Sequence, residues 1–272
     1  MRENDELWVM HRSSLSLGIR RAGIACGLHR LRYRQRLRVR TVDIPANLGV
    51  RVGMLADIHA DPVLMPPWLI QQAVDAINAA GPLDAVLIPG DFVARVDGVM
   101  PEVAGALRQL HAPVFASLGN HDAGRARLHV LEALAAANVT VLVNQSVPFP
   151  DRADVWIAGL DSLRPGIPDV VQALQDVGDT ARTIVMGHEP ELATQHGCVM
   201  HVAGHTHHGQ IRLRGLPLRY MPPGSQPYPE GLYALTDEPD GARRWVYTTA
   251  GIGSSELSLR IGCPPEIVIL TL

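Results

Sequence analysis

Five short apolar runs in this sequence each end in a cluster of polar residues, and this repeated arrangement restricts the fold more than any other feature. The runs occupy residues 50–57, 84–91, 112–122, 182–188 and 198–209. In the first half of the chain, helical patterns at 68–80, 102–110 and 124–137 alternate with them, which is typical of an α/β fold. We therefore expect the polar clusters to lie at the carboxyl ends of strands, where ligands bind in such sheets.

The pattern changes after Gly209, where strand-like segments follow one another without helices. These segments lie at 210–215, 231–237, 243–251 and 266–272. Their succession predicts a second sheet of four strands packed on the first. The proline-rich stretch 216–231 predicts a loop, and it is long enough to bind a substrate.

Length and composition exclude several classes of protein. A chain of 272 residues with 47% hydrophobic residues can bury one large core. The formal charge of −3 gives no basic surface overall, so we expect no nucleic acid as a partner. The three cysteines are far apart and form no C-x-x-C pair, which argues against a disulfide framework or a cysteine-rich zinc module. We expect a single domain at 37–272 preceded by an arm at 1–36.

The arm at 1–36 is rich in arginine and leaves two interpretations open. Its longest apolar stretch, 22–28, is far shorter than the ~20 residues of a membrane span. Arg20 and Arg21 resemble a twin-arginine signal, but the apolar region after them is too short and no small-residue cleavage site follows, so we do not expect export. The arm either rests on an anionic membrane surface or is solvated and leads into an edge strand at 37–44. The expected location is the cytoplasm, free or peripheral at the inner face of the membrane.

Each polar cluster alone can be interpreted as a strand-to-loop turn, but the five together indicate a metal site. If the strand ends converge, they bring together two aspartates, one asparagine and four histidines. Carboxylate, amide and imidazole ligands without a thiolate suit manganese, iron or zinc and argue against a closed structural zinc site. So many ligands exceed the needs of one ion. Two ions ~3.5–4 Å apart with a shared carboxylate would use them all.

The order of these motifs resembles that of the calcineurin-like metallophosphoesterases. The motifs D-x-H, G-D, G-N-H-D, G-H and G-H-x-H occur here at 57–59, 90–91, 119–122, 187–188 and 204–207. The likeness spans about residues 31–272. It is greatest to the YkuE-like branch, around 204–211 and the tail 250–272. The resemblance implies an α/β sandwich of two mixed β-sheets flanked by helices, the metallophosphoesterase-type fold.

The resemblance also implies a dinuclear metal centre, with manganese favoured over iron and zinc. It assigns three ligands to the first metal, three to the second, and one that bridges both. These are Asp57, His59 and His207; Asn120, His188 and His205; and Asp91. A hydroxide that bridges the two metals would attack phosphorus in line.

Two further residues are catalytic by the same resemblance. His121 takes the place of the histidine that protonates or stabilises the leaving oxygen, and Asp122 would orient its imidazole. The chain departs from the family pattern at His208, where relatives usually have glycine, and at Glu189, where many have asparagine. We expect His208 to face solvent, with a contact to substrate as the alternative. We expect Glu189 to add negative charge beside the second metal. Asp97 receives no role.

The predicted function is metal-dependent hydrolysis of a phosphoester, by a phosphodiesterase or a phosphatase. An alternative is hydrolysis of a lipid-linked pyrophosphate of the UDP-2,3-diacylglucosamine type at the membrane surface, which the arm would suit. A non-catalytic scaffold with the same fold is less favoured, because clustered buried polar groups need a ligand to satisfy them. A nuclease is disfavoured by the acidic balance. The expected partner is a phosphoester small molecule or a lipid-linked substrate.

Overall fold

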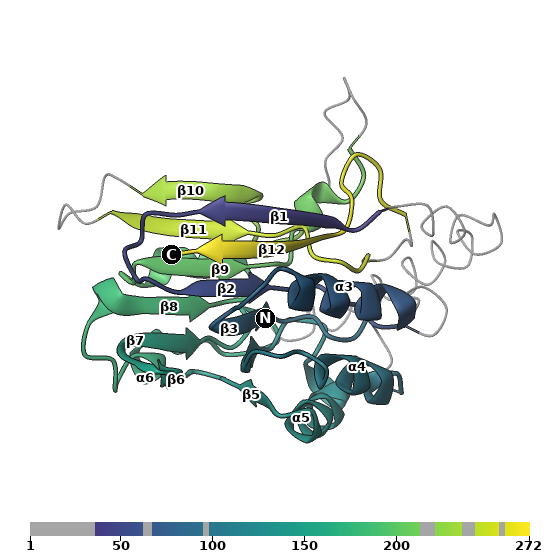
Figure 1. Ribbon diagram of the computed structural model, residues 1–272, viewed down its shortest axis with the longest axis horizontal. Coiled ribbons are helices and arrows are strands. Elements are labelled where there is room, and N and C mark those ends of the chain that lie inside the picture. The colour runs from purple at the N-terminus through teal and green to yellow at the C-terminus, as the bar shows by residue number, and fades with distance from the viewer. Residues whose placement is uncertain (1–35, 62–66, 95–97, 213–220, 236–242, 256–258) are drawn as a thin grey trace, which may run out of the picture.

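The computed structural model describes residues 36–61, 67–94, 98–212, 221–235, 243–255 and 259–272 (Figure 1). Two six-stranded sheets pack face to face, with helices outside them. The strands are β1 (Arg38–Asp43), β2 (Arg51–Met54), β3 (Ala85–Pro89), β4 (Val114–Ser117), β5 (Val139–Val141), β6 (Gln145–Phe149), β7 (Arg152–Gly159), β8 (Thr183–Met186), β9 (Met200–Ala203), β10 (Gly231–Leu235), β11 (Arg244–Thr248) and β12 (Glu266–Thr271). The α-helices are α3 (Pro67–Ala79), α4 (Met100–Leu107), α5 (Arg127–Ala136) and α6 (Val170–Ala173). Of the helices in the described part of the chain, none is long and apolar enough to cross a membrane.

Both sheets are mixed, which confirms the predicted fold class. The first has the strand order β1-β12-β2-β3-β4-β5, and the second has the order β10-β11-β9-β8-β7-β6. Strands β2 to β5 run parallel to one another, as do β7, β8, β9 and β11. Strand β3 is buried at all five positions. This is the burial that parallel strands acquire when both faces of their sheet are covered.

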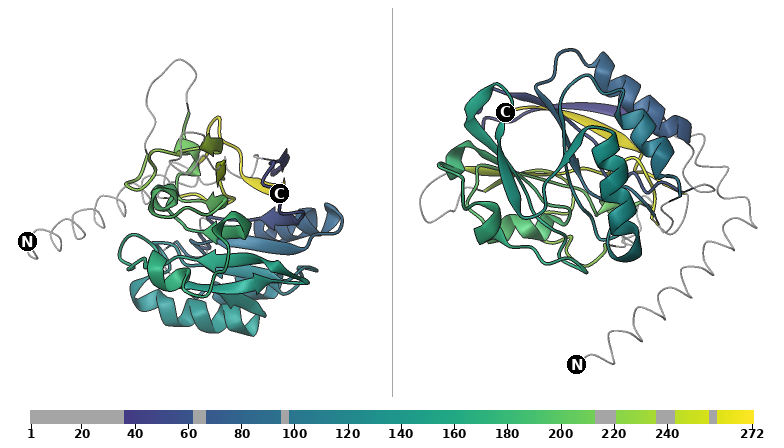
Figure 2. Two further views of the ribbon diagram at one scale, coloured as in Figure 1. Left: turned by 90° about the vertical axis from the view of Figure 1, so that its left-hand side faces the viewer. Right: turned by 90° about the horizontal axis from the view of Figure 1, so that it is seen from below.

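The prediction that four C-terminal strands form their own sheet is wrong. Strands β10 and β11 extend the second sheet, next to β9. Strand β12 instead lies in the first sheet, parallel to β1 and antiparallel to β2. The segment predicted at 210–215 makes one isolated bridge, between Ile211 and Ile261, and its residues 213–215 lie outside the described part. Figure 2 shows the C-terminal end of the chain beside the purple strand β1.

Apolar side chains fill two main layers. One cluster lies between the sheets and includes Met54, Leu87, Ile157, Met186 and Val202. A second joins the outer face of the first sheet to α3, α4 and α5, which cover that face (Figures 1 and 2). A smaller cluster lies under α6 on the second sheet. The hydrophobic effect therefore fixes both faces of the first sheet and leaves its loop ends free to carry polar residues.

Several local boundaries differ from those expected. Helix α4 begins at Met100, two residues before the predicted start, with proline in its first turn, where the missing N–H costs nothing. A 3₁₀ turn at Gly124–Ala126 precedes α5. Strand β6 was not predicted; its sequence QSVPF contains proline, which is tolerated because β6 is an edge strand. Almost all of the arm at 1–36 and part of the loop at 216–231 lie outside the described residues, as does Asp97.

Two neighbouring histidines, His201 on β9 and His196 before that strand, predict acid sensitivity that does not involve the predicted metal ligands. His201 on β9 is 1% exposed, and its Nδ1 lies 2.9 Å from His196 Nε2. Burial lowers the pKa of His201 well below its usual value and that of His196 to about 4. The unfolded chain therefore binds more protons than the folded chain below pH ~6.5, so stability falls as pH falls from ~6.5 toward 4.

We expect protonation of each of these histidines in the unfolded chain to lower the free energy of unfolding by about 2 kcal/mol when the pH falls from 7 to 5. Urea denaturation at the two pH values measures this loss. In His201→Gln the loss should shrink by about one ring's contribution, while His111→Gln, at an exposed position, should leave it unchanged. An equal loss in His201→Gln and the wild type would contradict the assignment.

Candidate metal centre

The predicted metal ligands gather at one end of the sandwich, where loops of both sheets meet. Asp57 and His59 follow β2, Asp91 follows β3, and Asn120 follows β4, all in the first sheet. The remaining three ligands, His188, His205 and His207, follow β8 and β9 of the second sheet. The backbone N–H of His205 donates to both oxygens of Asp57, at 2.9 and 3.1 Å, and so ties the two sheets together here.

Five of the seven have positive backbone φ angles, which L-residues with a Cβ adopt at a cost. The values are 49° for Asp57, 46° for His59, 59° for Asp91, 70° for His205 and 47° for His207. Such conformations persist only where the surrounding structure imposes them, and they concentrate at functional sites. The tight turns at the strand ends therefore aim these side chains inward at the expense of backbone strain.

The first group of ligand atoms belongs to Asp57, His59 and His207, all buried. His59 Nε2 and His207 Nε2 lie 3.0 Å apart. They are 3.9 and 3.7 Å, respectively, from Asp57 Oδ1. Two ring nitrogens and a carboxylate oxygen around one point form a donor set suited to a divalent transition metal.

The second group consists of Asp91, His188 and His205. His188 Nε2 is 3.1 Å from Asp91 Oδ2 and 3.2 Å from His205 Nδ1. The same Asp91 oxygen is 3.3 Å from His59 Nε2, which belongs to the first group. Asp91 therefore faces both groups, which is the position a shared carboxylate needs.

The outward ring nitrogens of the second group are anchored by main-chain carbonyls. His188 Nδ1 lies 2.8 Å from Pro89 O, and His205 Nε2 lies 2.8 Å from Pro223 O. A carbonyl only accepts, so each anchored nitrogen carries the proton and the other nitrogen is free to bind a metal.

Asn120 supplies a test of whether a metal fits. Its Oδ1 atom is buried and has no hydrogen-bond partner among the residues that the structure describes. A buried amide oxygen without a partner is costly, and amide oxygens bind divalent cations. Together with the two ligand groups, this atom fits divalent cations at the centre.

Two glycines of the motifs allow the close approach of the loops. A Cβ on Gly119 would collide with the Asp91 carboxylate, and a Cβ on Gly204 would lie 2.5 Å from Asp57 Oδ2. Glycine is therefore required at these positions for space, because any side chain would displace a carboxylate that faces the centre.

The two central carboxylates have opposite pKa shifts in the absence of metal. Burial raises the pKa of Asp57 to about 7, against the imidazole of His188. Burial also acts on Asp91, but the imidazoles of His188, His121 and His59 outweigh it and hold the pKa well below its usual value. Correspondingly, the pKa of His188 is raised well above its usual value by Asp91, despite burial. Asp91 is thus ionised and is the negative centre of the site.

His121 lies beside the first group, but Asp122 does not orient it as expected. The His121 ring is 4.7 Å from the His59 ring, centroid to centroid, and its Nδ1 lies 2.6 Å from Ala94 O. A backbone carbonyl therefore fixes the His121 ring and leaves Nε2 on the side of the centre. The role predicted for Asp122 is wrong in this detail, because successive residues in a turn point in different directions.

The Asp122 carboxylate instead fastens the loop after β3. It accepts hydrogen bonds from four backbone N–H groups, those of Asp91 (2.8 Å), Phe92 (2.7 Å), Val93 (3.2 Å) and Gly119 (2.9 Å). Burial and the charge of Asp91 raise the pKa of Asp122 to about 6 against these donors. Cations at the centre would remove the repulsion from Asp91, so we expect the four N–H groups to hold Asp122 ionised in the metal-bound protein.

Arg260 was missed by sequence reasoning. It is 2% exposed, and its Nη2 atom donates to His207 Nδ1 at 3.0 Å and to Ala250 O at 2.6 Å. Its Nε donates to Gly253 O at 2.7 Å. The guanidinium holds the His207 ring from the Nδ1 side, and Nε2 faces the first group. The only signal was position within the tail at 250–272, which gave no role to any single residue.

Both departures from the family pattern are buried. His208 is 7% exposed, and its Nε2 donates to Thr248 O at 2.9 Å, so the expectation that it faces solvent is wrong. Glu189 is 2% exposed, and its carboxylate accepts from Ser162 Oγ at 2.6 Å and from Leu163 N at 3.1 Å. Burial raises the pKa of Glu189. Glu189 therefore fastens the loop after β7.

Known proteins resemble this chain in both sequence and fold. A sequence model described as calcineurin-like phosphoesterase matches residues 50–209. An uncharacterized metallophosphoesterase, YkuE, of Bacillus subtilis (strain 168) is 32% identical over 235 residues, covering 82% of this chain and 79% of that protein. Phosphodiesterase YaeI of Escherichia coli (strain K12) is 30% identical over 241 residues, covering 82% of each. The structure of the Haemophilus influenzae NAD nucleotidase NadN is similar in fold, with a TM-score of 0.52 at 15% identity, over 74% of this chain and 45% of that one.

Proposed function

We propose that this chain, which belongs to the calcineurin-like phosphoesterase family, hydrolyses phosphodiesters with the aid of two divalent cations. Membership of this family makes the chain a phosphoester-hydrolysing enzyme. The observation that carries the dinuclear proposal is the place of Asp91, whose Oδ2 lies within 3.3 Å of a histidine nitrogen from each ligand group. The name of YaeI supports a diester as the substrate.

The proposed division of the residues between the two cations follows the family resemblance. Asp57, His59 and His207 would hold one, and His188, His205 and Asn120 would hold the other, with Asp91 between them. Manganese, iron and zinc all suit these oxygen and nitrogen donors, and manganese is our first choice. When bound, two such cations polarise a phosphoryl oxygen and bring the pKa of a water molecule close to neutrality.

His121 would hold the proton for the leaving oxygen. Its Nδ1–H is committed to Ala94 O, so the free Nε2 is the atom that exchanges a proton with substrate. Its ring stands edge to face against His59, with an interplanar angle of 81°, next to the first cation site. Arg260 holds the His207 ring in place from the Nδ1 side.

The alternative substrate, a lipid-linked pyrophosphate at the membrane surface, depends on the arm at 1–36. The alternative uses the same cation site and the same leaving-group histidine, so the two proposals differ only in the substrate that the protein hydrolyses. A water-soluble diester and a lipid-linked pyrophosphate of the UDP-diacylglucosamine type should therefore be compared on the same preparation.

Replacing His121 tests the proposal. We expect the full-length protein loaded with manganese to hydrolyse bis-p-nitrophenyl phosphate, and His121→Ala to lower kcat by about 10²-fold or more while keeping its bound manganese. The loss should be larger for a diester with an alkoxide leaving group, because alkoxides need protonation more than p-nitrophenolate does.

The matched control is His111→Ala, at an exposed position on the loop before β4, and its kcat should equal that of the wild type. Unchanged kcat in His121→Ala for both leaving groups would exclude the proposed role of His121. Absence of hydrolysis of any tested phosphoester by the metal-loaded wild type would contradict the proposed function itself.

A further inference from the structure

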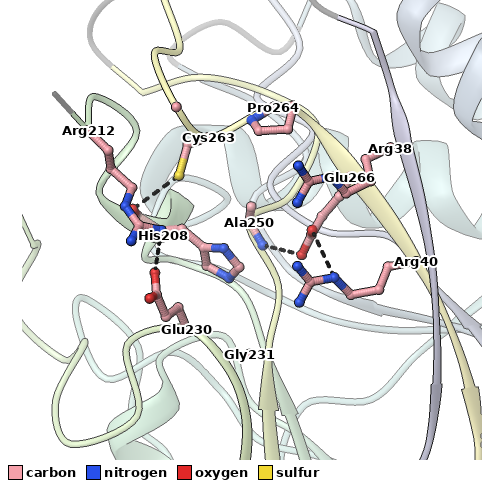
Figure 3. A pocket seen from close by; sticks show the side chains of 11 residues that line it. Arg38, Arg40, His208, Arg212, Glu230, Gly231, Ala250, Cys263, Pro264 and Glu266 are labelled. Carbon is pink, nitrogen blue, oxygen red and sulfur yellow. Dashed lines mark hydrogen bonds and ion pairs between the residues drawn. The ribbon is translucent and has the colours of Figure 1, made fainter. Parts of the chain in front are cut away.

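A second polar cavity lies beside the metal centre, between the edges of the two sheets (Figure 3). Its volume is about 220 Å³. Here the loops that follow β9 and β11 lie next to the amino ends of β1, β10 and β12. The lining residues are Arg38, Arg40, His208, Arg212, Glu230, Gly231, Ala250, Gly262, Cys263, Pro264 and Glu266.

The cavity exists because β1 carries arginines on a face that otherwise points into the sandwich. Residues alternate between the two faces of a strand, so Arg38 and Arg40 share a face with Val42, which packs against the core between the sheets. The Arg38 side chain is exposed and that of Arg40 is 38% exposed, so both guanidinium groups are accessible to a dissolved anion. Figure 3 shows both side chains at the cavity, on either side of Glu266.

The carboxylates in the lining do not balance the three arginines. Arg212 pairs with Glu230 at 2.9 Å. Arg40 is 3.8 Å from Glu266, whose Oε1 already accepts from Thr249 Oγ1 and Ala250 N, both at 3.1 Å. Arg38 has no carboxylate partner among the described residues. Three arginines and two glutamates give the lining a formal net charge of +1. Arg38 is the arginine whose charge no carboxylate of the lining offsets.

His208 forms one wall of the cavity. It has a φ of 50°, a conformation in which glycine is favoured, yet the chain places a buried imidazole there. The ring is held through Nε2 by Thr248 O, and Cys263 Sγ donates to His208 O at 3.2 Å. The ring is therefore a fixed part of the cavity wall.

We propose that this cavity binds a phosphate-type oxyanion, held by Arg38 and Arg40 beside His208. Guanidinium groups bind such anions through charge-assisted, paired hydrogen bonds. The site is separate from the metal centre, because the Arg260 side chain lies between them: it contacts His207 on one side and the carbonyls of Ala250 and Cys263 on the other. The anion is either free phosphate or the phosphate of a lipid headgroup.

Calorimetric titration with inorganic phosphate tests the proposal on the full-length, manganese-loaded protein. The metal centre also attracts phosphate, so we expect two sites in the wild type and one remaining in Asp91→Ala. The double variant Arg38→Gln/Arg40→Gln should lose the cavity site, with a Kd at least about tenfold higher, and keep the site at the metals. Arg243→Gln, an exposed arginine before β11, should bind as the wild type does.

Equal phosphate binding by the double variant and the wild type would overturn the proposal, as would the absence of any site in folded Asp91→Ala. If the double variant does not fold, Arg38→Gln alone serves, because this exposed side chain has no ion pair to lose.

Vesicles of phosphatidylglycerol and of phosphatidylcholine then separate the two sources of the anion. Weaker flotation of the double variant with the anionic vesicles assigns a lipid headgroup, and equal flotation assigns the free anion.

Discussion

Replacing Asp91 by alanine is expected to remove hydrolysis and to release metal from both halves of the centre. The Asp91 carboxylate lies within 3.3 Å of a histidine ring nitrogen of each ligand group, and its Oδ1 also accepts from the His121 backbone N–H at 2.9 Å. If Asp91 is shared by two cations as proposed, its loss would leave each of them one oxygen ligand short and would remove the negative charge that offsets them. Metal ions supply several kcal/mol of transition-state stabilisation, so kcat/KM should fall by about 10³-fold or more.

Metal analysis and steady-state kinetics on the same preparation check this expectation. Asp75→Ala, an exposed aspartate on α3, is the control and should keep both metal content and rate. Circular dichroism should show the wild-type fold in both variants. A folded Asp91→Ala protein that retains two equivalents of metal would rule out the bridging position of this residue.

Replacing Asp122 by alanine is expected to have the largest effect on stability. The change removes the acceptor for four buried backbone N–H groups, which then have no partner in the folded chain. Loss of a buried charge that is fully hydrogen-bonded costs about 3–5 kcal/mol. At a few degrees per kcal/mol for a domain of this size, Tm should fall by about 10 °C.

Thermal unfolding, followed by circular dichroism, measures this effect, with Asp176→Ala at an exposed position as the control. The comparison with His121→Ala separates the two neighbours. His121→Ala should lower kcat and leave Tm nearly unchanged, whereas the main effect of Asp122→Ala should be a lower Tm. A Tm change below about 2 °C in Asp122→Ala would mean that the four N–H groups find other partners.

The sequence contains enough information to predict the fold class and the place of the candidate site. Apolar runs such as 84–91 are strands because they are short, rich in branched residues and buried on both sides, and the polar residues at their ends have no place in a core. The ends of β2, β3 and β4 converge because parallel strands share one edge of a sheet. The ends of β8 and β9 belong to the second sheet and join them only because the two sheets pack together, which residue order does not show.

Strand order, in contrast, is not contained in the pattern. The segment 266–272 is as apolar as a strand of either sheet, and only packing of Ile267 on the helices and Val268 between the sheets places β12 in the first. The roles of His121 and Asp122 diverge for a similar reason. Adjacent in sequence, they contact different groups, because the turn sends one side chain to the centre and the other to the loop after β3.

The position of β12 has a consequence for how the protein is made. Strand β12 lies between β1 and β2, and its register pairs Arg38 with Glu266 and Met54 with Val268. During synthesis, β1 and β2 leave the ribosome long before the strand that joins them, so each has an unsatisfied edge while the rest of the chain is translated. Such distant pairing slows folding and exposes strand edges to other chains. Expression at low temperature or with chaperones should therefore raise the yield of folded protein more than a change in any single surface residue.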